Sequence, residues 1–205
     1  MKKLLPVIIS IVIVAYLAIM SSCRKQADGP LPPPMPPTPT ATPAPYLFYD
    51  FEESIDGWAK GGDPGITGGT YVPASSVPGG SVFSGNFCAQ ITCSFPASAA
   101  DGEFEVSPSP SNFTGRTITA HILIPSGMPP GYLIQLYVFN DGYANFDNST
   151  AQTVSSMTVN TWNTLTFPLS SLSNIDNVPK LGIQIIDDGA TAWSGNIYLD
   201  DVVVN

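Results

Sequence analysis

Short runs of β-favouring residues, separated by Gly, Pro, Asn and Asp, recur through residues 46–205, and this pattern limits the possible folds most. No segment of this region has a sustained helical period. Many short strands with regular turn signals are typical of a β-sandwich. We therefore predict an all-β domain built as an antiparallel two-sheet sandwich. The predicted strands are 46–52, 87–95, 103–107, 116–124, 132–140, 152–158, 163–169, 180–186 and 195–204.

Three of these strands differ in character between their two faces, because successive residues of a strand point in opposite directions. One face of each strand is purely aliphatic, and we expect these faces to form the core of the sandwich. The predicted core positions are Ile118, Ala120, Ile122, Ile124, Ile134, Leu136, Val138, Leu181, Ile183 and Ile185.

The opposite faces of the same strands carry polar and aromatic side chains. If the strands align, one outer face displays His121, Gln135, Tyr137 and Gln184. Aromatic rings cover the apolar C–H faces of sugars, and glutamine both donates to and accepts from sugar hydroxyls. The pattern predicts a carbohydrate-binding surface, and an ordinary solvated sheet face is the alternative.

The last strand changes the side on which its apolar residues lie. Its apolar positions switch parity between Leu199 and Val202. The apolar face can continue across this switch only if the strand slips by one residue. We therefore predict a β-bulge at Asp200 and Asp201.

The first strand carries carboxylates at its end, where Asp50 and Glu52 follow an alternating run. If the first and last strands are neighbours, Asp50 or Glu52 meets Asp200 or Asp201. These charges would repel one another unless a cation lies between them, and Ca²⁺ prefers carboxylate and carbonyl oxygens. We predict a structural calcium site with these residues as ligands; in the alternative, the aspartates only protect an exposed strand edge.

The charge of the domain limits its partners. Residues 46–205 contain 15 acidic residues and three basic ones, Lys60, Arg116 and Lys180. Such a surface repels phosphate backbones, so we expect no nucleic-acid binding. It suits neutral partners or a hard cation such as calcium.

Residues 1–22 have the features of an export signal. Lys2 and Lys3 precede an apolar stretch that ends at Ile19, and small residues follow. The sequence MSSC at 20–23 resembles the lipobox of bacterial lipoproteins, in which the signal is removed and the cysteine is acylated. The resemblance implies a lipid anchor at Cys23 and a place on the bacterial cell envelope outside the cytoplasm, on the outer membrane in a Gram-negative host. A simple membrane anchor is the alternative.

A proline-rich segment separates this signal from the domain. Residues 24–45 contain nine prolines, with Thr and Ala between them. Such a segment cannot build a core and favours an extended polyproline conformation. We interpret 23–45 as a lipidated cysteine followed by a stalk, and 46–205 as the only folded domain.

The domain has two cysteines, Cys88 and Cys93, both within one predicted strand. Five residues of extended strand separate two Cα atoms by roughly 16 Å, which is beyond the reach of a disulfide. We favour two unpaired cysteines, at least one of them packed as a small apolar residue.

Several segments of the domain, in order, resemble one family of proteins. The markers, in chain order, are the opening FYDFEESIDGW, the strand SGNFCAQIT, the middle run TITAHILIPSG and GYLIQLYVFNDG, the segment TWNTLTFPLSSL with NVPKLGIQI, and the closing GNIYLDDVVV. They resemble carbohydrate-binding modules with a galactose-binding-like jelly-roll fold, similar to those attached to bacterial β-mannanases and glucanases. Each segment is a weak marker, but the ordered set covers nearly all of residues 46–205.

This resemblance implies a fold, a metal and a ligand. It implies a jelly roll with a structural calcium near Glu52 and Asp200 or Asp201. It also implies glycan binding, with Gln135, Tyr137 and Gln184 on strands that line the cleft. It also implies that Trp193 and Tyr143 are stacking rings for the sugar, and that Trp58 and Trp162 are packing residues of the core.

An enzymatic function is the least favoured hypothesis. The single histidine, His121, lies in the middle of a predicted strand, where it is a poor candidate for a Ser-His-Asp triad. No carboxylate pair stands out for glycoside hydrolysis. We expect a non-catalytic domain that binds a polysaccharide such as mannan or glucan. The alternatives are a structural or adhesive envelope module of the same fold and, third, a jelly-roll hydrolase.

Overall fold

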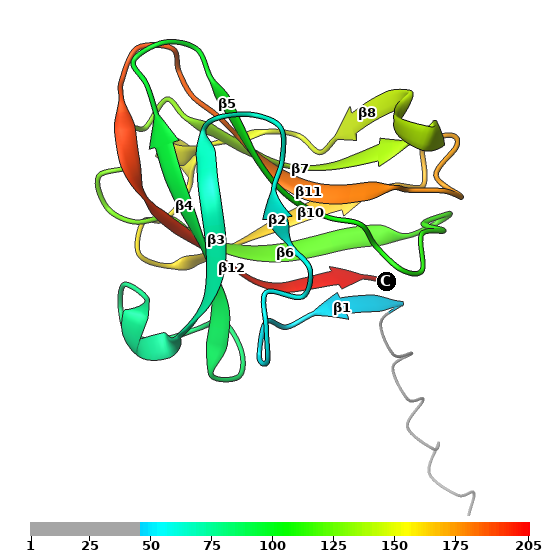
Figure 1. The fold of residues 1–205 in the computed structure, drawn as a ribbon, viewed down its shortest axis with the longest axis horizontal. Helices are drawn as coiled ribbons and strands as arrows, with labels where there is room; N and C mark the ends of the chain where they lie inside the picture. Colours follow the sequence, from blue (N-terminus) through cyan, green and yellow to red (C-terminus); the bar gives the residue numbers. More distant parts are fainter. Residues whose placement is uncertain (1–45) are drawn as a thin grey trace, which may run out of the picture. The chain divides into compact units, whose positions relative to one another are not determined.

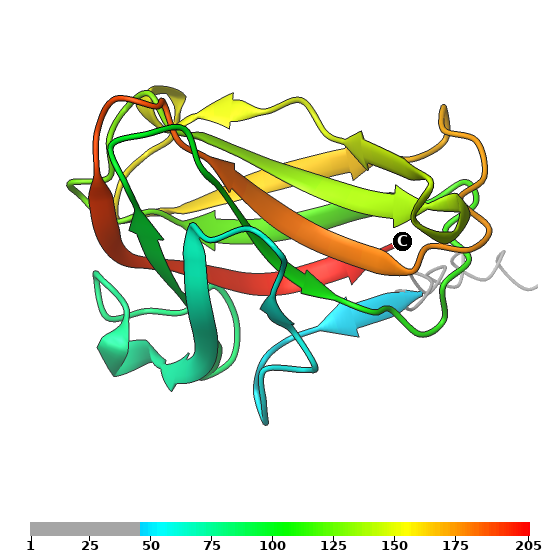
Figure 2. The ribbon, with the colours of Figure 1, turned by 45° about the horizontal axis from the view of Figure 1, so that its top comes forward.

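The computed structural model describes residues 46–205. These residues belong to one compact unit and form two antiparallel sheets that pack face to face (Figures 1 and 2). The predicted signal, the lipidated Cys23 and the proline-rich stalk lie outside the described residues. Within residues 46–205, no helix has the length and apolar character needed to cross a membrane.

The first sheet has the strand order β10-β6-β12-β4-β3, and β1 pairs with part of β12. Its strands are β1 (Leu47–Tyr49), β3 (Ile66–Pro73), β4 (Phe87–Phe95), β6 (Thr117–Leu123), β10 (Trp162–Pro168) and β12 (Trp193–Val204).

The second sheet has the strand order β2-β5-β11-β7-β8, and β9 pairs with the start of β7. Its strands are β2 (Ala59–Lys60), β5 (Asp101–Val106), β7 (Leu133–Asn140), β8 (Asn145–Asn148), β9 (Gln152–Thr153) and β11 (Lys180–Ile186). Three short 3₁₀ turns complete the described part of the chain: η1 (Ala74–Ser76), η2 (Asp141–Tyr143) and η3 (Val154–Ser156).

The core lies between the two sheets and confirms the predicted aliphatic faces. Every predicted core position on β6, β7 and β11 is buried, and so is Ile124 just after β6. Trp58 is also a core residue, as expected, and its ring stacks on Phe104 at a centroid distance of 5.6 Å. The two-sided pattern of these strands therefore places their other faces on the outside of the sandwich.

The predicted strands and the observed ones differ in several places, and the short strand β2 is one that the pattern does not predict. β3 is a glycine-rich strand at 66–73, and β8 at 145–148 contains two asparagines and an aspartate, so neither has a strong strand pattern. The predicted strand 152–158 contains only two strand residues and then turns into η3. Tertiary pairing with longer neighbours outweighs local propensity at such edges.

The C-terminal strand confirms the predicted bulge. The register between β12 and β6 shifts between Asp200 and Val203, and Asp201 has a φ of 44°. Apolar residues on both sides of the shift, Leu199 and Val202, are fully buried. β1 pairs with β12, with Leu47 opposite Val204, so the condition of the calcium hypothesis that the first and last strands are neighbours is met. Since β12 lies inside the first sheet, protection of an exposed edge does not explain the two aspartates.

The two cysteines of the domain are unpaired and buried, as expected. They lie an odd number of residues apart on β4 and therefore point to opposite faces. Cys93 belongs to the main core, whereas Cys88 belongs to a small second cluster with Val77, Leu123 and Tyr198. Burial raises the pKa of each thiol to about 12. Trp162, predicted as a core residue, packs against this smaller cluster and is partly exposed.

Candidate functional site

The outer face of the second sheet brings together Gln135, Tyr137 and Gln184, as the alternation predicts. Gln184 lies directly opposite Gln135, and Gly182 lies opposite Tyr137. All three side chains are nearly inaccessible, with Gln135 at 5%, Gln184 at 7% and Tyr137 at 0% exposure. They form the floor of the face, and their hydrogen bonds show what holds them there.

Tyr137 lies flat across the neighbouring strand. A Cβ atom on Gly182 would come within 2.4 Å of the Tyr137 ring, so only glycine leaves room for it. The ring spans β11 and its hydroxyl donates to Glu105 Oε2 on β5 at 2.7 Å. Lys180 Nζ lies 3.0 Å from the other oxygen of Glu105. Burial and the bond to Glu105 raise the pKa of Tyr137, which keeps the hydroxyl a donor.

A chain of side-chain hydrogen bonds crosses four strands of this face, and we call it the amide relay. Asn148 Nδ2 donates to Gln135 Oε1 at 2.9 Å, and Gln135 Nε2 donates to Gln184 Oε1 at 2.6 Å. Gln184 Nε2 then donates to Asp101 Oδ2 at 3.4 Å. The relay therefore runs from β8 to β5 and gives both buried glutamines a donor and an acceptor partner.

Three carboxylates occupy alternate positions of β5 on the same face: Asp101, Glu103 and Glu105. Burial raises the pKa of Glu103 to about 7, and the charges of Asp63, Glu105 and Asp101 act in the same direction. Burial, with Asp63 and Asp187, also raises the pKa of Asp101. This side of the face is therefore acidic, and Lys180 neutralises only Glu105.

Exposed aromatic rings cover the other side of the face. Phe146 on β8 stacks on Tyr137 with a centroid distance of 4.9 Å and an interplanar angle of 23°, and it is 38% exposed. Tyr143 at the end of η2 is 56% exposed and packs against Phe139 at 5.6 Å. Tyr143 thus lies beside Phe139, which itself packs against Phe146, and its role as a stacking ring stays a prediction. Phe146 was not among the predicted residues, although it is the exposed ring above Tyr137.

Two predicted residues belong to the first sheet, so grouping them with the three floor residues is wrong. His121 on β6 pairs with Asp200 and Thr164, and its ring stacks on Phe83 at 3.4 Å. Burial lowers the pKa of His121. Trp193 is the first residue of β12, and its ring packs on Tyr132 at 6.2 Å. Alternation gives the face of a residue within its own strand, but not the sheet that the strand joins.

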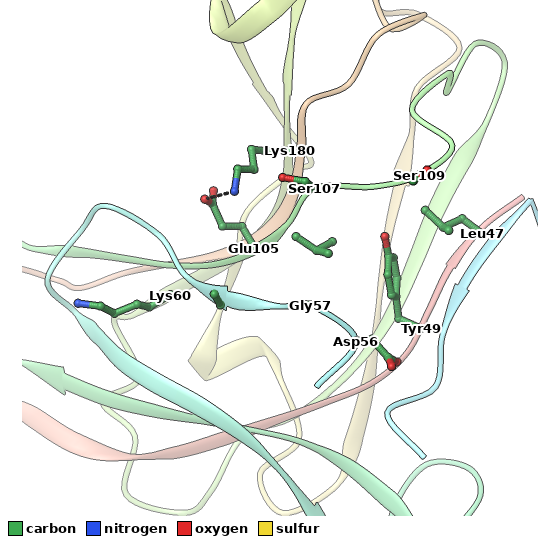
Figure 3. A pocket seen from close by; sticks show the side chains of 11 residues that line it. Leu47, Tyr49, Asp56, Gly57, Lys60, Glu105, Ser107, Ser109 and Lys180 are labelled. Carbon is green, nitrogen blue, oxygen red and sulfur yellow. Dashed lines mark ion pairs between the residues drawn. The ribbon is translucent and has the colours of Figure 1, made fainter. Parts of the chain in front are cut away.

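A cavity of about 360 Å³ lies beside the acidic side of the face (Figure 3). The Lys180–Glu105 ion pair lies on one side of it and Tyr49 on the other, with Asp56 below the tyrosine. Burial, with Asp56, raises the pKa of Tyr49 to about 12, so its hydroxyl remains a donor. The cavity extends the polar surface beyond the last residue of β5.

Three of the four predicted metal ligands, Glu52, Asp200 and Asp201, contact one segment, residues 83–87, which we call the brace loop. Asp200, fully buried, accepts hydrogen bonds from the amides of Phe83 at 2.9 Å and Ser84 at 3.1 Å. Glu52 accepts from the amides of Asn86 at 2.8 Å and Phe87 at 3.1 Å. Both carboxylates therefore hold the same loop through its backbone.

The pKa values of these two acids differ in direction. Burial raises the pKa of Asp200 to about 7, although amides of Ser84, Asp201 and Phe83 favour its charged form. Burial also disfavours the charge of Glu52, but the amides of Phe87 and Asn86 bring its net pKa below the usual value.

Whether calcium fits this region depends on which carboxylate oxygens are already used in hydrogen bonds. Asp201 accepts from the Ser84 hydroxyl at 2.7 Å, and Asp50 accepts from the Glu52 amide at 3.2 Å. Each of the four carboxylates thus already has a hydrogen-bond donor. Within residues 46–205, no three Asp, Glu, His or Cys side chains are grouped so that they could hold a metal ion. Calcium here would need further oxygen ligands, such as backbone carbonyls, beside these carboxylates, and it stays a prediction.

A family model described as "Mannanase, galactose-binding domain-like" matches residues 49–201. The chain belongs to this family. The match includes the whole amide relay, the carboxylates of β5 and the ring of Phe146. No significant match exists among the curated proteins.

Solved structures share the fold of this family member. A carbohydrate-binding module of promiscuous specificity from the β-sandwich superfamily has a TM-score of 0.61 at 19% identity, over 77% of this chain and 60% of that chain. The chain therefore spans less than two thirds of that protein. The CBM27-1 module of Caldicellulosiruptor saccharolyticus, solved with mannohexaose, has a TM-score of 0.57 at 16% identity, over 79% of this chain and 97% of that chain.

A third structure is the CBM22-1 xylan-binding domain from Paenibacillus barcinonensis Xyn10C, with a TM-score of 0.51 at 18% identity, over 78% of this chain and 92% of that chain. At such identities these likenesses show the fold, which is the predicted all-β, galactose-binding-like sandwich.

Proposed function

We propose that the domain binds a neutral polysaccharide, without catalysis, on the outer face of the second sheet. The observation that carries the proposal is the exposed ring of Phe146, stacked on Tyr137 beside the polar groups of the amide relay. A sugar ring has apolar C–H faces and a rim of hydroxyls, so it needs an aromatic platform next to hydrogen-bonding groups.

The ligand class that we propose is a β-glycan such as mannan or glucan. The family carries mannanase in its description, and one neighbour was solved with mannohexaose. Another neighbour is named a xylan-binding domain. Mannohexaose and xylohexaose are therefore the first probes, and a glycan array extends the search.

Calorimetric titration of residues 46–205 with these oligosaccharides tests the proposal. We expect Phe146→Ala to weaken binding about tenfold, because one stacking ring contributes about 1–1.5 kcal/mol. Phe48→Ala is the matched control, since Phe48 is 45% exposed but lies on β1 of the first sheet. If both variants bind like the parent, the face is the wrong one. If the parent binds no glycan, a structural or adhesive module becomes the better description.

The hydrolase hypothesis finds little support in the carboxylates of this face. Glu103 and Glu105 follow one another along β5 instead of facing each other across a cleft. Glycosidases place two carboxyl groups on opposite sides of the scissile bond. Release of reducing sugar from mannan by the purified domain would contradict our proposal that it only binds.

We also propose that the domain is displayed on a bacterial cell envelope by a lipid at Cys23. The support is the sequence around 20–23 and the proline-rich segment that follows it. We expect Cys23→Ser to yield an uncleaved precursor that takes up no labelled palmitate. Normal processing of this variant would contradict the lipoprotein assignment.

A further inference from the structure

The hydrogen bonds of the amide relay have a direction, and Asp101 determines it. An ionised carboxylate accepts hydrogen bonds but cannot donate them. Gln184 must therefore turn its Nε2 toward Asp101, which leaves its Oε1 facing Gln135. Gln135 in turn donates through Nε2 and presents Oε1 to Asn148.

The buried position of the glutamines makes this direction strict. Gln135 and Gln184 are 5% and 7% exposed, so water cannot readily replace a missing partner. A reversed amide would place two acceptors or two donors against each other, which costs free energy in a buried setting. One anion at the end of the relay therefore orients both buried glutamines, and through them the partner that Gln135 offers to Asn148.

The far end of the relay reaches the surface at Asn148, which is exposed. Its Nδ2 donates both to Gln135 Oε1 and to the backbone oxygen of Ser149, each at 2.9 Å. Both amide hydrogens are therefore used, and among residues 46–205 no donor is bonded to its Oδ1. Asn148 lies two residues from Phe146 on β8 and hence on the same face.

We infer that Asp101 is a positioning residue for glycan binding. Through Gln184 and Gln135 it holds Asn148 with its Oδ1 toward solvent. There the Oδ1 atom can accept a hydrogen bond from a hydroxyl of a sugar stacked on Phe146. This inference rests on the function proposed above. It adds a polarity requirement: the sugar must donate a hydrogen bond at this position. Asp101 is the only anionic residue of the relay, and the Ser149 carbonyl favours the same direction at its far end.

The surrounding charges indicate how this direction is lost. Asp63, Asp187 and Glu103 all lie near Asp101, and burial with the first two raises its pKa. A protonated Asp101 can donate, as can an asparagine at this position. In either case the relay can reverse: Gln135 and Gln184 still pair with each other, and Asn148 turns its amide hydrogens outward and gives up its bond to the Ser149 oxygen.

Substitution of Asp101 by asparagine tests the inference, with mannohexaose and xylohexaose as probes. We expect Asp101→Asn to weaken binding roughly tenfold, the scale of one misoriented hydrogen bond. Asp63→Asn is the matched control, because it removes a negative charge from the same region, and no hydrogen bond joins Asp63 to the relay. Equal losses in both variants would attribute the effect to net charge and overturn the inference.

A rescue variant makes the test sharper. In Asp101→Asn combined with Gln184→Glu, the anion moves one position along the relay. The introduced glutamate would accept from Gln135 Nε2 and from the introduced asparagine, which restores the direction at Gln135 and Asn148 with the parental net charge. We expect this double variant to recover most of the lost affinity, and a double variant as weak as Asp101→Asn would count against the relay.

A measurement without ligand separates this inference from the proposed function. The side-chain amide signals of Gln135, Gln184 and Asn148 in ¹H–¹⁵N spectra report their bonding directly. We expect Asp101→Asn, but not Asp63→Asn, to change the signals of Gln135 and Asn148, and the double variant to restore them. Unchanged signals overturn the inference even if glycan binds. If the signals change as expected but no glycan binds to the parent, the proposed function fails while the relay stands.

Discussion

Two groups of acidic side chains in this domain, one on each sheet, have hydrogen-bond partners of different kinds. On the first sheet, Asp200 and Glu52 accept backbone amides of the brace loop. On the second sheet, Asp101 and Glu105 accept from the side chains of Gln184 and Tyr137. A backbone amide can donate to a carboxylate whichever side chain its residue carries, whereas a side-chain donor is lost or altered when its residue is substituted. The first group therefore holds the fold together, and the second group sets the chemistry of a surface.

The largest effect that this comparison predicts is on stability. In Asp200→Ala, the amides of Phe83 and Ser84 lose a buried acceptor, and we expect the free energy of unfolding to fall by about 3 kcal/mol. Urea unfolding measures this change. Glycan affinity of the folded variant should stay near that of the parent, since Asp200 lies on the other sheet. A loss of affinity with unchanged stability would reverse the roles that we assign to the two groups.

Calcium would strengthen the same region. We propose that calcium, if it binds near Glu52 and Asp200, stabilises the folded state by about 2.7 kcal/mol at a hundredfold excess over its dissociation constant. A chelator should then lower the melting temperature, added calcium should restore it, and Glu52→Ala should abolish the response. An equal melting temperature with and without chelator would contradict the calcium site, and Glu52 and Asp200 would then only accept hydrogen bonds from the brace loop.

Tyr137→Phe removes one hydrogen bond from the second group and leaves the ring in place. We expect a loss of about 1 kcal/mol in stability, the usual value of such a bond, because Glu105 keeps its ion pair with Lys180. Glycan affinity should change by less than in Phe146→Ala. Tyr137→Ala should instead destabilise strongly, because the ring is fully buried. Thermal unfolding and calorimetric titration of the two variants distinguish these roles.

A further predicted effect is a pH dependence of the free energy of unfolding that comes from Glu103. Its pKa is about 7 in the folded state against a reference of 4.5, so the folded protein binds more protons between these values. This group therefore favours folding more at pH 5 than at pH 8, and its contribution decreases as the pH rises through about 7. Glu103→Gln should flatten this slope in urea unfolding, whereas Glu53→Gln, at an exposed position, should not. A steeper slope in Glu103→Gln would contradict the assignment.

The sequence predicts those features that depend on a single strand or on its immediate neighbours. Alternation places the aliphatic core correctly, and the parity switch before Val202 predicts the bulge. Sheet membership depends on long-range pairing, so alternation could not separate His121 from Gln135.

The candidate site was only partly predictable for the same reason. Phe146 lies in the segment ANFDN, which has turn-forming residues and no strand pattern. Its importance comes from the pairing of β8 with β7, which stacks the ring on Tyr137. The amide relay likewise joins residues from four strands, and no spacing in the sequence indicates which of them meet.

The placement of the two thiols offers a way to follow how the domain opens. Cys93 is enclosed by the main core, and Cys88 is enclosed by the smaller cluster next to the brace loop. A thiol reagent can modify each only after its surroundings open, so the two labelling rates report separate local unfolding events. In residues 46–205 these are the only cysteines. We expect Cys88 to be modified first, because its cluster contains only three other buried residues, and the region of the brace loop would then open before the main core.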